Sequence, residues 1–405
     1  MRPRPPDVGI PFFEPSAHPD AVLAAGAEPV PLRLPTARPP GGVALAREWV
    51  ADATEVSCAG ANLDALLLAS DDPEQLFGML LAAARLGLPA VCDAPPGTPL
   101  SAALTALGFS PPSGNAAGVA AGTASGGPRP GGLLDNFSLA NALRAGVAAG
   151  GGPGLLIHLS ALAREAGVAG FGQMVRVLAP ETPAAAPAWV AEHGVPALLA
   201  ALGDALHDGP TVSGQLKKGL PSAPPSLDGA QRFVFVRARA SGGEALCRAP
   251  AGVLEAAGGC RVFSCEGTAV RAVRAGEVGS DALLVVLGCG PRGGPGLLRL
   301  DALGAALGEA GLATPVVTDG LAPEGVAGLW ASLFSPEAAV GGVMGRLRDG
   351  DGLRLDLGGG RIRTDVVTEE FTSRKPSDPP SRAGAGYAAR YARSALPALE
   401  GAGFG

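Results

Sequence analysis

The chain has 405 residues, of which 47% are hydrophobic and 17% are charged, and its formal net charge is −6. This length is sufficient for two or three domains with apolar cores. Acidic and basic residues are interspersed along the chain, whereas phosphate binding relies on concentrated Lys and Arg, so we expect no nucleic-acid partner.

The N-terminal stretch M-R-P-R-P-P-D-V-G-I-P-F-F contains no apolar core of signal-peptide length, and no apolar run reaches membrane-spanning length. The cysteines form no C-x-x-C pair, so a zinc finger is not expected. We therefore expect a cytoplasmic protein with reduced thiols and no membrane partner. The six cysteines are Cys58, Cys92, Cys247, Cys260, Cys265 and Cys289.

The first half of the chain alternates short apolar runs with helical stretches rich in alanine and leucine. Residues 65–70, A-L-L-L-A-S, predict a buried strand, residues 73–89 predict a helix and its end, and residues 89–92 predict the next strand. This β-α-β order is typical of a parallel sheet flanked by helices.

Residues 94–134 have a different composition, in which Pro, Gly and Ser dominate and the hydrophobic periodicity fades. We interpret them as a loop or a partly disordered segment. Helical patterns return over residues 135–167, with a glycine break at residues 150–154. Residues 187–209 predict two helices around a turn.

A second proline-rich linker, at residues 219–231, precedes a change to strand-like patterns of period two. Residues 232–240 alternate as a strand does, and residues 353–367 predict a hairpin around a glycine turn. We therefore predict an α/β fold with an N-terminal parallel-sheet domain and flanking helices over residues 1–225. A C-terminal β-rich, barrel-like domain with a helical tail follows over residues 226–405.

A glycine-rich loop, G-C-G-P-R-G-G-P-G at residues 288–296, follows the apolar run A-L-L-V-V-L-G. Gly288, Gly290 and Gly293 have the G-x-G-x-x-G spacing of dinucleotide-binding loops. Such a loop must lead into a helix whose N-terminus faces the pyrophosphate. Two prolines interrupt this segment and no helix begins at the third glycine, so we expect no nucleotide cofactor.

Several motifs follow one another in a recognisable order. The glycine loop is followed by T-D-G, S-P-E-A-A-V-G-G, R-D-G-D and a closing G-Y-A-A-R-Y-A-R, and the first half contains A-R-E-W-V-A-D-A-T-E and D-A-L-L-L-A-S-D-D-P-E-Q-L-F-G-M-L-L-A-A-A-R-L. These resemble, in the same order, motifs of the dihydroxy-acid dehydratase and phosphogluconate dehydratase family, including Y-E-G-P-[KR]-G-G-P-G and S-R-E-x-I-A-D-S-V-E. The chain is identified as a shortened, divergent member of that family.

The resemblance implies a reaction that removes water from a hydroxy acid. Family members use an iron–sulfur cluster on three cysteines, commonly with a nearby magnesium ion. Hydroxide is a poor leaving group, so a Lewis-acid iron takes its developing charge. A base removes the proton beside the carboxylate.

In the first half, the positions that carry these roles hold other residues. The cluster cysteine of the family's C-D-K triplet corresponds to Asp72, its magnesium-binding aspartate to Pro73 and its modified, metal-binding lysine to Glu74. The Ser-Thr-Asn of a later family loop has become Gly-Pro-Gly at residues 152–154. No cysteine occurs within residues 93–246, where the second cluster ligand is expected, and the chain starts too late to contain the remaining one.

In the second half, the magnesium-binding glutamate of Y-E-G-P corresponds to Cys289, the glutamate of x-E-M to Arg299 and the serine base to Pro323. A proline side chain has no donor, acceptor or basic group, so neither Pro73 nor Pro323 replaces the family's residue. Cluster binding needs thiolates at defined positions. We therefore expect no cofactor, and we do not expect an ordinary iron–sulfur dehydratase.

The catalytic candidates are Cys289, Glu324 and Glu74. Asp72 and Glu74 are also the only candidates for a new metal site. We favour a helix start instead, with Asp72 as N-cap, Pro73 at the first helical position and an acid in the first turn. Cys289 is a nucleophile or soft ligand in one interpretation and a small buried thiol in the other, more usual one.

The substrate-binding candidates flank the former pocket of the family. The two arginines among them suit an anionic ligand such as a carboxylate, and ion pairing at the surface or between domains is the alternative. The histidine is a hydrogen-bonded core residue in the simpler interpretation, and the aspartate shapes the T-D-G turn. The candidates are Arg292, Arg299, Gly293, Gly294, Asp319 and His158.

Two functional hypotheses follow. In the first, the chain is an enzyme repurposed for cluster-independent chemistry on a small carboxylate or a biosynthetic intermediate. In the second, it is a non-catalytic pseudoenzyme that pairs with or regulates an active partner. The resemblance also implies a homodimer.

Overall fold

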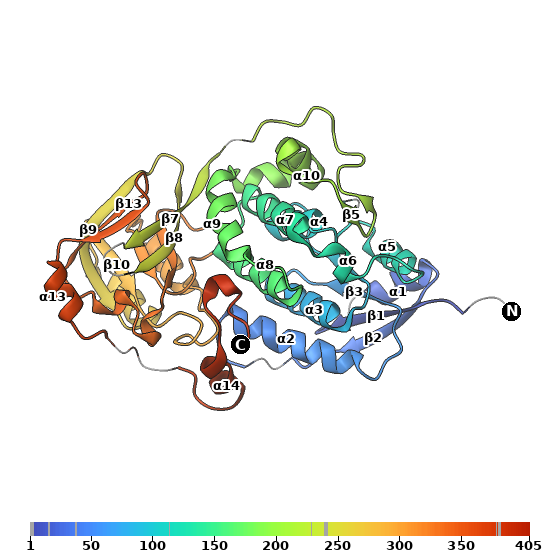
Figure 1. The fold of residues 1–405 in the computed structure, drawn as a ribbon, viewed down its shortest axis with the longest axis horizontal. Coiled ribbons are helices and arrows are strands. Elements are labelled where there is room, and N and C mark those ends of the chain that lie inside the picture. The colour runs from blue at the N-terminus through green and yellow to red at the C-terminus, as the bar shows by residue number, and fades with distance from the viewer. Residues whose placement is uncertain are drawn as a thin grey trace.

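The computed structural model describes residues 4–14, 17–36, 39–112, 114–227, 229–238, 242–377, 379 and 382–405. The N-terminal half contains a four-stranded parallel sheet, and the C-terminal half forms a closed eight-stranded barrel (Figure 1). The predicted α/β fold with these two parts is confirmed. No helix in the described part of the chain has the length and apolar composition needed to cross a membrane.

The parallel sheet has the strand order β2-β1-β3-β4. The central strand β3 is apolar throughout and almost completely buried, as expected for a parallel strand covered on both faces. The predicted strands at residues 65–70 and 89–92 are confirmed to within one residue. The strands are β1 (Asp7–Phe12), β2 (Glu28–Arg33), β3 (Ala65–Ala69) and β4 (Ala90–Asp93).

Ten helices lie within the described residues of the N-terminal half. The long α10 contains a break at Gly194, where φ is 80° and ψ is 166°, so the two helices predicted around a turn are observed. The helices are α1 (His18–Ala24), α2 (Val43–Cys58), α3 (Pro73–Leu86), α4 (Pro99–Ala106), α5 (Ala116–Thr123), α6 (Pro130–Leu133), α7 (Asn136–Ala148), α8 (Pro153–Glu165), α9 (Phe171–Glu181) and α10 (Pro187–Leu202).

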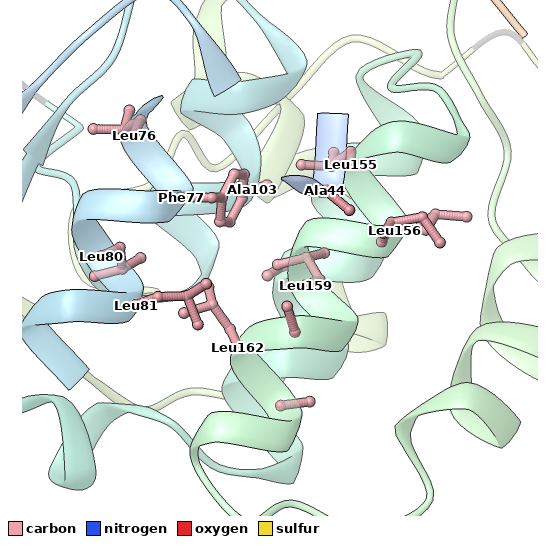
Figure 2. Close-up of a cluster of buried hydrophobic side chains, with 14 of the residues drawn as sticks. Ala44, Leu76, Phe77, Leu80, Leu81, Ala103, Leu155, Leu156, Leu159 and Leu162 are labelled. Atoms are coloured by element: carbon pink, nitrogen blue, oxygen red, sulfur yellow. The ribbon is translucent and has the colours of Figure 1, made fainter. Parts of the chain in front are cut away.

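Helices α3 and α8 pack against each other at the centre of the largest hydrophobic core. Figure 2 shows Phe77 and Leu81 of α3 facing Leu159 and Leu162 of α8. The start of α3 follows the predicted pattern, because the Asp72 carboxylate accepts hydrogen bonds from two first-turn amides at 2.9 and 3.2 Å. The helix-start interpretation of this segment is therefore confirmed.

Residues 94–134 were expected to be a loop, and this expectation is wrong. The segment contains α4, α5 and α6. Helix α4 begins with a capping box between Thr98 and Ser101, and the Asn115 side chain accepts the amide of Gly118 at the start of α5. These helices consist largely of Ala and Gly and lack one strongly apolar face, so their sequence has little helical periodicity.

The barrel has the strand order β10-β11-β12-β8-β7-β14-β13-β9. Strands β9 to β12 are parallel neighbours in sequence order around the barrel, and α11 and α12 connect the first three of them. The predicted hairpin is the antiparallel pair β13 and β14. The strands are β7 (Gln231–Ala238), β8 (Gly243–Pro250), β9 (Glu255–Phe263), β10 (Ala282–Val286), β11 (Val316–Thr318), β12 (Trp330–Ser335), β13 (Gly352–Asp356) and β14 (Arg361–Thr364).

Shorter elements complete the described structure. The domain boundary predicted at residue 225 lies between β6 and β7 and stays a prediction. The remaining elements are the small hairpin β5 (Pro210–Thr211) and β6 (Gly214–Gln215), the helices α11 (Glu266–Arg274), α12 (Asp301–Glu309), α13 (Thr368–Ser373) and α14 (Gly386–Ser394), and the 3₁₀ segments Gly203–Ala205, Ala338–Val340, Val343–Arg346 and Ala398–Glu400.

The C-terminal tail returns to the N-terminal domain, where Figure 1 shows α14 near α2. Tyr391 of α14 is fully buried in the same core as α3 and α8, and its hydroxyl donates to the carbonyl of Ala402. The buried Arg47 of α2 donates to the carbonyl of Gly401 at 2.6 Å and to Glu48 at 2.8 Å. The tail is thus part of the N-terminal core.

The glycine loop joins the barrel domain to α2. The backbone amides of residues 42–44 donate to carbonyl oxygens of residues 295–297 at distances of 2.8 to 3.1 Å. Amides in the first turn of a helix have no acceptor within it, so the loop caps α2. The backbones approach so closely that a Cβ atom on Gly42 would lie 2.2 Å from the carbonyl oxygen of Leu297.

Gly296 offers a test of this joint, because its φ is +86° and a Cβ atom there would lie 2.4 Å from Cβ of Leu45. We expect Gly296→Ala to lower the free energy of unfolding by about 2–4 kcal/mol through backbone strain and overpacking. Gly308→Ala, at an open position in α12, is the matched control and should raise it by about 0.5–1 kcal/mol. Urea unfolding checks both, and a Gly296→Ala variant as stable as the wild type would contradict the described joint.

Candidate functional site

A cavity of about 310 Å³ lies between the N-terminal domain and the barrel. Its N-terminal wall includes the first turns of α3, α4 and α8, and its barrel wall includes Arg248, Arg299 and Glu324. The N-terminus of a helix carries a partial positive charge. Three such termini and two arginines therefore bring positive charge to the cavity, beside the carboxyl groups of Glu74 and Glu324.

Glu74 lies in the first turn of α3 and is 8% exposed. Its Oε1 atom is 3.3 Å from Nη1 of Arg299. Burial and the neighbouring Asp72 raise the pKa of Glu74 to about 8, although Arg299 opposes the shift. The Glu74 carboxyl group is therefore largely protonated at neutral pH, and it can both release and accept a proton near pH 8.

Glu324 lies in the loop after β11 as a solvent-exposed residue, and its carboxyl group reaches the N-terminus of α8. Its Oε2 accepts a hydrogen bond from the amide of Gly152 at 3.1 Å. A Cβ atom on Gly152 would lie 2.6 Å from the Glu324 oxygens, so the glycine provides the space that this carboxyl group occupies. Burial raises the pKa of Glu324, while Arg248 and Arg299 lower it.

Arg299 lies between the glycine loop and α12, and its donors are engaged by carboxylates. Its Nε atom donates to both oxygens of Asp301, at 3.1 and 3.0 Å, and its Nη1 donates to Glu74. Burial alone lowers the pKa of Arg299, but Glu74 and Asp301 more than offset it and raise the pKa. Arg299 therefore orients Glu74 within the cavity.

Arg248 of β8 was not singled out from the sequence. It is 3% exposed, lines the cavity and donates from Nε to the Gln231 side chain at 2.6 Å. Neither of its terminal nitrogens has a hydrogen-bond partner among the described residues. The available signal was a charged residue inside the otherwise apolar run A-L-C-R-A.

His158 of α8 also lines the cavity and is 1% exposed. Its ring stacks on Phe77 with centroids 5.0 Å apart, and its Nδ1 atom has no hydrogen-bond partner in the described structure. Burial, together with the charge of Arg47, holds the pKa of His158 well below its usual value. The imidazole is therefore neutral and contributes a flat, weakly polar surface.

Asp319 lies outside this cavity and binds the glycine loop. Its buried carboxylate accepts the amides of Gly288 at 3.1 Å, Cys289 at 2.8 Å and Ala338 at 3.0 Å. Burial raises the pKa of Asp319, and these three amides oppose the shift. The residue therefore shapes the turn, as the simpler interpretation of the T-D-G motif predicts.

Glu337, a residue of the S-P-E-A-A motif, binds the other half of the loop. Its carboxylate accepts the amides of Arg292 and Gly293, each at 3.0 Å. The Arg292 side chain donates to the carbonyl of Ala395, and Gly294 donates its amide to a carbonyl within the loop. The loop amides thus bind carboxylates of the protein itself, in the way that a phosphate is bound elsewhere.

Cys289 is fully buried in a hydrophobic cluster beside the barrel and is not among the residues that line the cavity. Burial raises the pKa of its thiol to about 12. The thiolate, which is the nucleophilic and ligating form, is therefore scarce at neutral pH. The cavity brings together Glu74, Glu324, Arg299 and His158, and leaves Cys289 and the glycine-loop candidates outside.

The donor set does not fit the family's iron–sulfur cluster and magnesium ion. All six cysteines are free, and no three His, Cys, Asp or Glu side chains gather as a metal site would require within the described ranges. Asp72 caps α3, and Glu74 faces an arginine. A guanidinium beside a carboxyl group suits a proton or an anion rather than a metal cation, so we derive no chemical step through these groups.

Comparison with known proteins agrees with this architecture. Residues 242–402 match the family described as "Dihydroxy-acid/6-phosphogluconate dehydratase C-terminal". The chain is 32% identical over 302 residues to a dihydroxy-acid dehydratase of Citrifermentans bemidjiense and 32% identical over 300 residues to one of Geobacter metallireducens. It is 32% identical over 309 residues to dihydroxy-acid dehydratase 2 of Bordetella bronchiseptica.

These matches cover 67% to 69% of this chain and 54% of each relative. The chain thus spans about half the length of the curated relatives that it matches. The family match spans β8 to β14 of the barrel and α14. The chain therefore belongs to the dihydroxy-acid/6-phosphogluconate dehydratase family.

Proposed function

We propose that the cavity between the two domains binds a small carboxylate and that Glu74, assisted by Glu324, transfers a proton on it without an iron–sulfur cluster. One observation carries this proposal. Two carboxyl groups with raised pKa values, of which Glu74 is buried, share one cavity with two arginines and three helix N-termini. Perturbed acids in a concave site are typical of proton-transfer chemistry.

Glu74 is the better suited of the two acids. A general acid or base works best when its pKa lies near the working pH, and that of Glu74 is raised to about 8. Arg299 fixes the orientation of its carboxyl group, and Asp301 holds Arg299 in turn. Glu324 is held by the amide of Gly152, which positions a second carboxyl group in the same cavity.

The class of reaction follows from what the cavity offers. Departure of hydroxide needs strong charge neutralisation, and no metal donor set is formed by the described residues. Arginines and helix N-termini do stabilise charge that develops on a carboxylate when the neighbouring carbon loses a proton. We therefore favour isomerisation, or elimination of a better leaving group, on a 2-hydroxy acid or a related acid.

The protonation state of Glu74 predicts how stability depends on pH. A glutamate in an unfolded chain has a pKa of about 4.3, so between about pH 4 and pH 8 only the unfolded state loses its proton. Glu74 therefore makes the wild type progressively less stable across this window. Glu74→Gln mimics the protonated form and should match the wild type near pH 4.

Above pH 8 we expect Glu74→Gln to be more stable than the wild type by several kcal/mol, since each pKa unit corresponds to about 1.4 kcal/mol. Urea unfolding at intervals from pH 4 to pH 9 measures the difference. Glu369→Gln, at an exposed glutamate of α13, is the control and should differ from the wild type equally at every pH. A flat difference for Glu74→Gln would contradict the raised pKa.

Proton transfer itself can be measured in deuterated water. We expect the protein to exchange the 2-hydrogen of at least one small 2-hydroxy acid, or to convert that acid, as followed by proton NMR. Glu74→Gln should slow this by about 10²- to 10⁴-fold, while Glu369→Gln should not. Treatment with EDTA should leave the rate unchanged.

Three outcomes of this experiment count against the proposal. Turnover that depends on a metal or cluster, or that survives Glu74→Gln, would overturn the assigned chemistry. Binding of the acids with no exchange or conversion would instead favour the non-catalytic, regulatory role. A protein that copurifies only with an active dehydratase would point in the same direction.

A further inference from the structure

We infer that Arg248 is the anchor for the carboxylate of the ligand, a role for which the sequence offered Arg292 and Arg299. This inference rests on the proposed function, because it concerns the same cavity. Arg248 is the side chain that receives the anionic group, and its terminal nitrogens set the geometry of that contact.

The orientation of Arg248 follows from the alternation of side chains along β8. Ala245, Cys247 and Ala249 belong to the hydrophobic core of the barrel, whereas Leu246 belongs to the core of the N-terminal domain. Successive side chains of a strand point to opposite faces. Arg248 therefore lies on the outer face with Leu246, toward the N-terminal domain, and it lines the cavity there.

The hydrogen bonding of Arg248 is incomplete. Its Nε donates to Gln231 at 2.6 Å, but Nη1 and Nη2 have no partner among the described residues, although the residue is 3% exposed. A buried polar group without a partner is destabilising, and native structures rarely retain one without a functional reason. Here the two nitrogens that form the fork of the guanidinium are those left without acceptors.

The other two arginines do not offer a comparable fork. Arg299 donates from Nη1 to Glu74 and from Nε to both oxygens of Asp301, so its charge is already matched by the Asp301 carboxylate. Arg292 donates to the carbonyl of Ala395 and borders a separate cavity of about 270 Å³. Arg248 thus has the free donors that a ligand needs.

The surroundings of Arg248 favour a carboxylate. Burial raises the pKa of Glu324 and lowers that of Arg248, while the attraction between the two groups opposes both shifts. The Glu324 carboxyl group nevertheless accepts no hydrogen bond from the terminal nitrogens of Arg248, which stay available to a ligand. The first turns of α4 and α8 border the same cavity and add positive potential. A carboxylate accepts hydrogen bonds from both terminal nitrogens of Arg248 in a planar, two-point contact. The compact ammonium group of a lysine could not provide this contact.

Two measurements test this role, and neither depends on turnover. The probes are glycolate, its neutral amide glycolamide and inorganic phosphate, in a buffer without other carboxylates or phosphates. We expect the wild type to bind glycolate in calorimetry and to bind glycolamide at least about tenfold more weakly, because charged hydrogen bonds supply the affinity. Arg248→Met and Arg248→Lys should each weaken glycolate binding at least about tenfold.

The second measurement is the thermal stability of the ligand-free protein. If Arg248 only supported the fold, its replacement would lower the melting temperature. An arginine dedicated to a ligand is unsatisfied without it, so Arg248→Met should melt at the same temperature as the wild type or higher. In Arg248→Met the Gln231 side-chain amide loses its hydrogen-bond donor. The double variant Gln231→Leu/Arg248→Met removes this amide as well, and it should melt no lower than Arg248→Met.

Arg363→Met, at an exposed arginine of β14, is the matched control and should leave glycolate binding unchanged. The inference is overturned if Arg248→Met retains the wild-type affinity for glycolate, or if the wild type binds neither glycolate nor phosphate. It is also overturned if Arg248→Met and Gln231→Leu/Arg248→Met both melt well below the wild type. Phosphate binding that exceeds glycolate binding would overturn the assignment to a carboxylate.

The anchor and the proposed chemistry can fail separately. Glycolate binding that depends on Arg248 without any proton exchange leaves the anchor in place and removes the chemistry. Exchange that proceeds equally well in Arg248→Met removes the anchor and leaves the chemistry of Glu74.

Discussion

The structure depends on the hydrogen bonds that the backbone of the glycine loop forms. Its amides bind the buried carboxylates of Asp319 and Glu337, and its carbonyl oxygens cap the start of α2. One short segment therefore fixes the barrel's own turn and also docks the N-terminal domain. The cavity has walls from both domains, so its shape is set by this docking. The loop resembles a phosphate-binding loop because its backbone amides also bind anions. Here those anions are the carboxylates of the protein's own Asp319 and Glu337.

The candidate site combines acidic and basic side chains, and no metal donor set forms among the residues that the structure describes. In this cavity positive charge comes from guanidinium groups and helix N-termini. The arginines lower the pKa of both acids, but burial raises it by more. Stabilising negative charge on a bound carboxylate is the role that we propose for these positive groups. Glu74, whose pKa is raised to about 8, is the acid that this balance leaves largely protonated at neutral pH.

The sequence predicted the parts of the fold that have strong local signals. The all-apolar β3, the Asp-Pro-Glu start of α3 and the hairpin of the barrel each follow from residue pattern and turn chemistry. The helices α4 to α6 were missed because Ala and Gly give no contrast between faces. Glu74 and Arg299 could be placed together from family motifs, but Arg248 could not, since its burial and its missing partners arise only when the domains meet. The motif predicts which residues flank Cys289 along the chain, but it does not predict where the thiol of Cys289 is buried.

The path of the chain has a consequence for synthesis. Tyr391, Gly401 and Ala402 complete the hydrophobic core that begins with α2, although the entire barrel lies between them in sequence. During translation the first domain therefore emerges from the ribosome long before its last packing partners exist. Arg47 therefore gains its carbonyl acceptor at Gly401 only after the whole barrel has been synthesised.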